Sequence, residues 1–178
     1  RPWINYYRTW NFNDSLKPII ANSTDFICGH IHAKSFIQEF PNSLYITWMR
    51  SPVSKIKSLY NHIITRPKHT DNAHAQYVVD NKLTIDEFIR LEWTWNYSLK
   101  FLADTKPEDF SHIGFCETFE KSVRGLSIKL YNHPLKLIST HENSSIYDSK
   151  LSKSQVDYIE SKNKEELIFY NHARKLFL

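Results

Sequence analysis

Two side chains of the sequence, Arg50 and Ser58, are spaced to bind a phosphate group. The planar guanidinium of an arginine matches phosphate oxygens, and the free amides of a first helical turn attract anions. Positions 51, 54 or 55, and 58 recur at helical spacing, so Ser58 lies on the same helix face as Ser51 and can reach the same anion. The spacing predicts an anion site. The alternative is an ordinary capped helix beside a surface arginine.

The segment at residues 44–62, LYITWMRSPVSKIKSLYNH, contains the elements that would position Arg50. Residues 44–49 form a short, nearly unbroken apolar and aromatic run, which is typical of a strand covered on both faces. Ser51 can cap the helix that follows, and Pro52 suits its first position. The predicted site therefore lies at the carboxyl end of a strand, where open α/β sheets bind ligands.

A second motif precedes this segment, and the two together resemble a known family. Residues 25–36 read DFICGHIHAKSF, and residues 50–60 fit the pattern R-(D/S)-P-x-x-(R/K)-x-x-S-x-Y. The pair resembles the carbohydrate sulfotransferases of the heparan sulfate 2-O-sulfotransferase type and their smaller microbial relatives. The resemblance implies that Arg50 and Ser58 bind the 3′-phosphate of the donor 3′-phosphoadenosine 5′-phosphosulfate. It also implies that His30 is the general base that activates a hydroxyl acceptor, a carbohydrate, without a metal.

The resemblance extends over most of residues 26–177. Residues 110–123, FSHIGFCETFEKSV, are similar to the family's strand that ends in G-x-x-E before a helix. Residues 96–103 resemble its N-x-x-T-R-x-L-A helix with the T-R pair replaced. Residues 141–145 lie where the family has a loop near the nucleotide, and residues 164–177 resemble its closing helix, which reads D-x-x-x-Y.

One departure concerns the loop that binds the donor's 5′-phosphosulfate. The family opens with a strand and a loop of the form P-K-T-G-T-S, and nothing like it stands in this sequence, which has three glycines. We expect residues 1–178 to be a single sulfotransferase-like domain that lacks this N-terminal strand and loop. A non-catalytic remnant that binds a nucleotide or an anionic glycan is the alternative function.

Composition agrees with a globular protein of one domain. Hydrophobic residues make up 41% of the chain, the net charge is +4, and no apolar run approaches membrane-spanning length. This mild basic excess suits an anionic donor and offers little support for a nucleic-acid partner. Cys28 and Cys116 each follow or end a strand-like run, which favours two buried free thiols over a disulfide and weakly favours a cytoplasmic location.

The hydrophobic pattern predicts an α/β fold, with a mostly parallel sheet flanked by helices of the P-loop sulfotransferase kind. Thr84 begins a capping box, and a single apolar helix face is predicted to follow it. Residues 65–81 are predicted to be a polar loop. Predicted strands are residues 26–28, 44–49, 112–115 and 135–139, and predicted helices are residues 53–64, 84–103, 118–131 and, in two pieces, 152–176.

Alternatives remain for several polar side chains. His30 and His32 could share a metal ion, or His32 could be the base. Glu117 is either a carboxylate at a helix start or a ligand-facing one. Trp93 and Trp95 alternate within a predicted helix, so that at most one of them belongs to the core, and the other covers a partner element or stacks on a sugar. Lys55 is expected on a solvated basic helix face.

Overall fold

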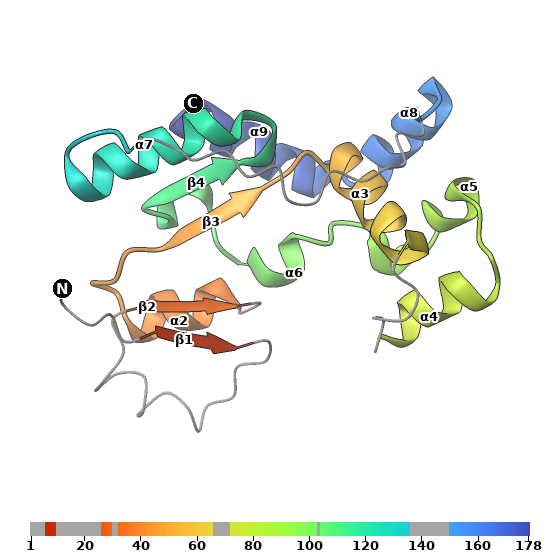
Figure 1. Ribbon diagram of the computed structural model, residues 1–178, viewed down its shortest axis with the longest axis horizontal. Coiled ribbons are helices and arrows are strands. Elements are labelled where there is room, and N and C mark those ends of the chain that lie inside the picture. Colours follow the sequence, from red (N-terminus) through yellow and green to blue (C-terminus); the bar gives the residue numbers. More distant parts are fainter. Residues whose placement is uncertain (1–5, 10–25, 30–31, 66–71, 103, 136–149) are drawn as a thin grey trace. The chain divides into compact units, whose positions relative to one another are not determined.

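The computed structural model describes residues 6–9, 26–29, 32–65, 72–102, 104–135 and 150–178. These residues belong to two compact units (Figure 1). One unit takes its elements from Arg1–Ser43 and Leu99–Thr105, and the other from Leu44–Ser98 and Lys106–Leu178.

The described residues of the first unit form a pair of parallel strands and two short helices. Strand β1 (Tyr6–Thr9) pairs in parallel with β2 (Phe26–Gly29), with Tyr6 opposite Phe26. Helix α2 (Ala33–Glu39) contacts α6 (Leu99–Leu102). The sequence predicted β2 and missed β1, because no turn signal and no alternation mark the four residues YYRT.

The second unit is built around another parallel pair. Strand β3 (Ile46–Met49) pairs with β4 (His112–Phe115), with Trp48 opposite Gly114. All of β4 is buried, whereas Trp48 on β3 is 36% exposed. The prediction that the strand within residues 44–49 is covered on both faces is therefore wrong. The fully covered strand among the described residues of this unit is β4.

Each strand of this pair leads into a helix. Strand β3 is followed by α3 (Pro52–Thr65), and β4 is followed by η5 (Cys116–Thr118) and α7 (Phe119–Tyr131). Figure 1 shows β3 and β4 side by side below α7. Because the strands are parallel, both strand-to-helix junctions lie at the same edge of the sheet.

The core of the second unit lies between helices. Helices α8 (Lys153–Lys162) and α9 (Lys164–Phe177) confirm the predicted two-piece C-terminal helix. Helix α3 packs on α4 (Ala73–Asp80), α5 (Ile85–Phe88) and α8. Their contact is an apolar cluster, in which the buried residues are Ile56, Ile63, Ala75, Val78, Phe88, Ile89 and Ile159.

Two predictions about the middle of the chain are wrong. Residues 84–103 do not form one helix, because α5 ends at Phe88, the short helix η3 (Glu92–Thr94) follows, and Asn96 has a φ of 46°. The predicted capping box is confirmed, since the Thr84 side chain and Glu87 bind each other's backbone amides. Residues 65–81 are not wholly a loop, because α4 occupies part of them.

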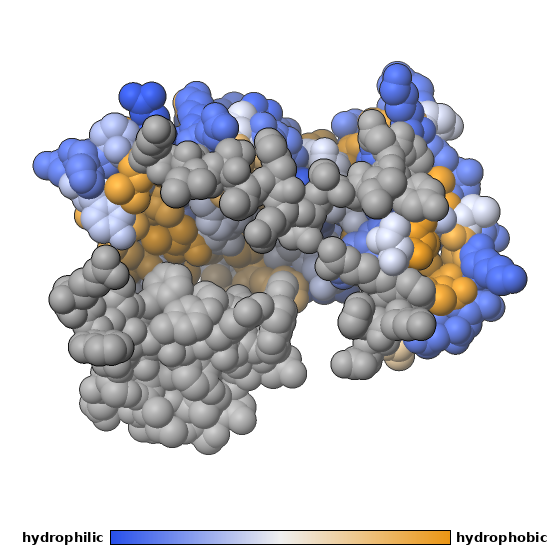
Figure 2. All heavy atoms as spheres, viewed as in Figure 1, coloured by the Kyte–Doolittle hydropathy of each residue, from blue (hydrophilic) through white to orange (hydrophobic). Residues whose placement is uncertain are grey.

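The described part of the chain is thus mixed α/β, with two-stranded parallel sheets and flanking helices. Figure 2 shows hydrophilic residues over the outer side of α7 and α8, and apolar residues below α7 on the side of the strands. Among the helices in the described ranges, none combines the length and the apolar character that crossing a membrane requires.

Candidate anion-binding site

The start of α3 has the cap that the sequence predicts. Pro52 is the first residue of the helix, and the Ser51 hydroxyl accepts a hydrogen bond of 3.2 Å from the Ser54 amide. The Val53 amide has no acceptor among the described residues, as expected for a first helical turn. The junction therefore keeps a backbone donor for an anion.

Arg50 lies between the end of β3 and the start of α3 and is partly buried. Its guanidinium makes no hydrogen bond or ion pair with any other residue that the structure describes. Cys116, the first residue after β4, lies near it. Partial desolvation raises the pKa of the Cys116 thiol, and the positive charge of Arg50 opposes that rise. Cys116 is a free and exposed cysteine, so the prediction of a buried thiol is wrong for this residue.

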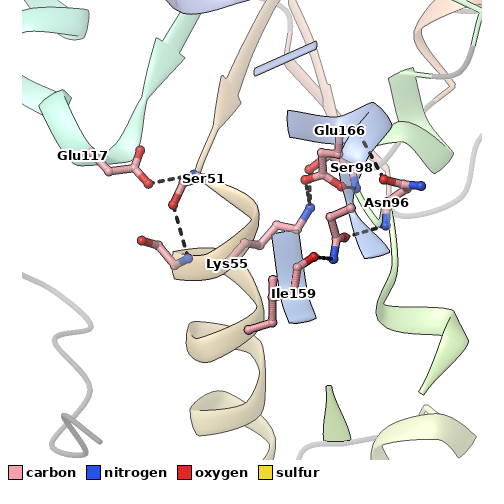
Figure 3. Close-up of polar contacts among 9 residues, drawn as sticks. Ser51, Lys55, Asn96, Ser98, Glu117, Ile159 and Glu166 are labelled. Atoms are coloured by element: carbon pink, nitrogen blue, oxygen red, sulfur yellow. Dashed lines mark hydrogen bonds and ion pairs between the residues drawn. The ribbon is translucent and has the colours of Figure 1, made fainter. Parts of the chain in front are cut away.

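Glu117 connects the two junctions. Its Oε1 accepts a hydrogen bond of 2.7 Å from the Ser51 amide (Figure 3). Its Oε2 accepts one of 3.1 Å from the Tyr170 hydroxyl. Glu117 lies in the first turn of η5, which agrees with its interpretation as a carboxylate at a helix start. Its carboxylate, however, serves the start of α3, where the helix dipole favours a negative charge.

Tyr170 supports this carboxylate from α9. The side chain is 4% exposed and its ring packs edge-on against Phe115 of β4, with ring centroids 5.4 Å apart. The pKa of Tyr170 is raised to about 12, first by burial and then by the charge of Glu117 and the hydrogen bond to it. Tyr170 is therefore protonated at neutral pH and donates to Glu117.

A second polar contact joins α3 to α9. Lys55 binds the carboxylate of Glu166, whose side chain is completely buried (Figure 3). The other oxygen of Glu166 accepts a hydrogen bond of 3.0 Å from the Ser98 amide. The prediction of a solvated basic face is therefore wrong for Lys55, whose charge pairs with a buried carboxylate.

The segment between η3 and α6 is held by the same two C-terminal helices. The Asn96 amide donates to Asn163 over 2.7 Å, and the Asn96 side chain accepts from the Glu166 amide over 3.2 Å. Asn163 donates in turn to the Ile159 carbonyl over 2.7 Å. These contacts explain why the chain leaves helical geometry at Asn96.

The structure describes two of the three predicted site residues. Ser58 is partly buried on α3 and lies about 10 Å further along the helix than Ser51, because each residue advances a helix by ~1.5 Å. A phosphate bound by both Arg50 and Ser58 would lie along the first two turns of α3. His30 lies outside the described residues. His32, the alternative base, is described, and its ring lies 6.1 Å from that of Phe101.

The remaining candidates have partners inside the protein. Trp93 stacks on His74, and the Trp95 ring nitrogen donates to the Ile89 carbonyl over 3.1 Å. Both tryptophans therefore cover partner elements. Among the described residues, no group of three or more histidines, cysteines or carboxylates is placed to hold a metal ion. The predicted nucleotide loop at residues 141–145 lies outside the described residues, and so does the predicted strand at 135–139 beyond its first residue.

Sequence reasoning missed Lys55 as an internal residue and missed the joint roles of Glu166 and Tyr170. The two α9 residues are four positions apart and so lie one turn apart on the helix. Their spacing in ELIFY is that of the D-x-x-x-Y pattern, which was the available signal. Comparison of the chain with protein-family models, with curated proteins and with solved structures yields no match.

Proposed function

We propose that this protein is a sulfotransferase that moves a sulfuryl group from 3′-phosphoadenosine 5′-phosphosulfate to a hydroxyl, most simply that of a carbohydrate. Arg50 and Ser58 bind the 3′-phosphate of the donor, and His30 takes the proton of the acceptor hydroxyl. The fold proposed for the whole chain is that of the P-loop-type sulfotransferases.

The observation that carries the proposal is the state of Arg50. Its guanidinium stands at the carboxyl end of a parallel strand, next to a helix start, without a partner among the described residues. Because no carboxylate among the described residues occupies its planar fork, the guanidinium is available to the oxygens of an anionic ligand. The Val53 amide adds a backbone donor to the same place.

The chemistry follows from the groups assigned. The acceptor oxygen forms a bond to sulfur while the bond from sulfur to the donor's 5′-phosphate oxygen breaks, and the electron pair leaves with the nucleoside bisphosphate. The acceptor proton passes to the imidazole of His30. Such transfers depend mainly on positioning and charge stabilisation, and a general base contributes about 10²–10⁴-fold.

Calorimetry with two nucleotides tests the binding part of the proposal. We expect Arg50→Ala to lower the affinity for 3′-phosphoadenosine 5′-phosphate by about 10- to 100-fold. The affinity for adenosine 5′-phosphate should not change, because only the first ligand has the 3′-phosphate. Arg50→Lys keeps the charge and loses the planar fork, so its affinity should be intermediate. Arg124→Ala, on the exposed side of α7, is the matched control for a lost positive charge. Equal affinity of wild type and Arg50→Ala for the bisphosphate would refute the assignment.

Transfer is tested with radiolabelled donor and a panel of glycans. His30→Ala should abolish transfer and keep nucleotide affinity. Nucleotide binding by the wild type without transfer to any acceptor would favour the non-catalytic alternative.

A further inference from the structure

Helix α9 holds the first turn of α3 at two successive points. Lys55 binds Glu166 directly, and Ser51 is joined to Tyr170 through the carboxylate of Glu117. Lys55 lies one turn after Ser51, the cap of α3, and Glu166 and Tyr170 are one turn apart on α9. The first of these points is a buried ion pair. The second ends on the peptide bond between Arg50 and Ser51.

That peptide bond matters for the direction of Arg50. A peptide unit is planar, so the Ser51 N–H lies in one plane with the Arg50 carbonyl. When Glu117 holds the N–H at 2.7 Å, it also restrains the rotation of the backbone at Arg50. The Tyr170 hydroxyl fixes the other oxygen of the same carboxylate at 3.1 Å. Through this chain of contacts, α9 restrains the backbone that carries Arg50 at the end of β3.

We infer that Glu117 and Tyr170 are positioning residues for the anion site, which they serve by orienting Arg50 rather than by touching the ligand. The inference rests on the proposed binding of the donor's 3′-phosphate by Arg50. According to this inference, residues that follow β4 and lie on α9 contribute to the affinity for the nucleotide.

Glu117 could instead compete with the anion, and that role predicts the opposite change in anion affinity when Glu117 is removed. A carboxylate that occupies the place of the ligand's phosphate competes with it, so its removal would strengthen anion binding. If Glu117 positions Arg50, its removal leaves Arg50 without that restraint, so Glu117→Ala would weaken anion binding. Glu117→Gln separates charge from geometry, because the amide keeps an oxygen acceptor for the Ser51 N–H and removes the negative charge.

The test is calorimetry of the whole chain with 3′-phosphoadenosine 5′-phosphate and with adenosine 5′-phosphate. We expect Glu117→Ala and Tyr170→Phe to lower the affinity for the bisphosphate by about 5- to 10-fold, which is the effect of one lost hydrogen bond. The affinity for the monophosphate should not change. Glu117→Gln keeps the acceptor for the Ser51 N–H and should bind the bisphosphate more tightly than Glu117→Ala. Glu120→Gln, an exposed carboxylate on the next helix, is the control for charge alone.

The two ligands distinguish positioning from a general loss of structure. A partly unfolded variant loses affinity for both nucleotides by the same factor, whereas a misdirected Arg50 affects only the ligand with the 3′-phosphate. If Glu117→Ala does not fold, Tyr170→Phe, which removes one hydroxyl, decides alone. Unchanged bisphosphate affinity in both variants, or tighter binding in Glu117→Ala, overturns the inference and leaves the proposed function standing. A wild type that does not bind the bisphosphate overturns the proposed function and the inference together.

Discussion

Lys55 of α3 and Glu166 of α9 form an ion pair inside the protein. The Glu166 side chain is 0% exposed and that of Lys55 is 18% exposed. The Ser98 hydroxyl also binds Lys55, and the Ser98 amide donates to Glu166. A charged pair in such a place is tolerated only when each charge has its partners, so the two residues depend on each other.

Removal of one member of this pair should destabilise the protein strongly. We expect Lys55→Met to lower the free energy of unfolding by about 3–5 kcal/mol, because it leaves the Glu166 carboxylate buried without its partner. The double variant Lys55→Met/Glu166→Leu should recover much of the loss, since no charge remains buried. Urea denaturation measures each value.

The exposed pair of Lys153 and Asp157 is the control for this prediction. Their atoms are 2.6 Å apart, and their side chains are 88% and 55% exposed. Lys153→Ala should leave the urea midpoint unchanged. A double variant no more stable than Lys55→Met would contradict the interpretation, because it would show that the lost packing, and not the unpaired charge, carries the cost.

Gly114 on β4 leaves room for the ring of Trp48 on the neighbouring strand. A Cβ atom at Gly114 would lie 2.4 Å from the Trp48 ring, which cannot remain in place. We expect Gly114→Ala to lower the free energy of unfolding by about 1–3 kcal/mol, the range for overpacked sites. Denaturation with urea measures the effect.

Gly125 is the matched control for this prediction. It lies inside α7, and a Cβ there would meet only the His112 ring at 3.5 Å, an ordinary contact. Gly125→Ala should be neutral or stabilise the helix by about 0.5–1 kcal/mol. Equal losses in both alanine variants would mean that the Trp48 contact does not decide the outcome.

The parts of the fold that the sequence predicted correctly are those with a local signal. Helix α3 has a serine cap and a proline at its start, and α7, α8 and α9 have long apolar periodicity. The predicted helix at residues 84–103 has the same periodicity and nevertheless breaks. Its break at Asn96 depends on hydrogen bonds to Asn163 and Glu166, which are about 70 residues away, and no local pattern reports such contacts.

The candidate site divides in the same way. Arg50 and Ser58 could be proposed from the sequence because they belong to one strand-to-helix segment. Glu117 and Tyr170 reach that segment from distant positions, 66 residues from Ser51 to Glu117 and 53 from Glu117 to Tyr170. Only the parallel pairing of β3 and β4 brings Glu117 to the start of α3. Residue types alone could not distinguish its role from that of a simple helix-start carboxylate.

His112 should make the protein sensitive to acid. Burial lowers the pKa of His112, the nearby charge of Lys129 lowers it further, and a hydrogen bond with the Ser122 backbone opposes both. Its Nε2 atom is buried without a hydrogen-bond partner among the described residues. The unfolded chain therefore binds the proton first as the pH falls. Stability should be full above pH 6.5, the ordinary value, and should be lost as the pH falls through the lowered folded value.

Urea midpoints between pH 8 and pH 4.5 measure this dependence. His112→Gln cannot titrate and should flatten the curve below pH 6.5, whatever its stability at neutral pH. His62→Gln, at an exposed position of α3, should keep the wild-type curve. An unchanged acid slope in His112→Gln would show that other groups cause it.

Tyr170 should titrate later than an ordinary tyrosine. Its pKa is raised to about 12 from 10.0, first by burial and then by the charge and hydrogen bond of Glu117. The unfolded chain loses the proton at lower pH than the folded one, so the stabilisation is complete below pH 10 and is lost as the pH rises through about 12. The absorbance of tyrosinate near 295 nm follows the titration of the ten tyrosines, and the difference from Tyr170→Phe isolates one of them. Glu117→Gln should move this difference only part of the way back toward pH 10, because burial remains. A complete return would mean that the carboxylate, and not burial, is the main cause of the shift, and that the contact between Glu117 and Tyr170 is stronger than its length of 3.1 Å indicates.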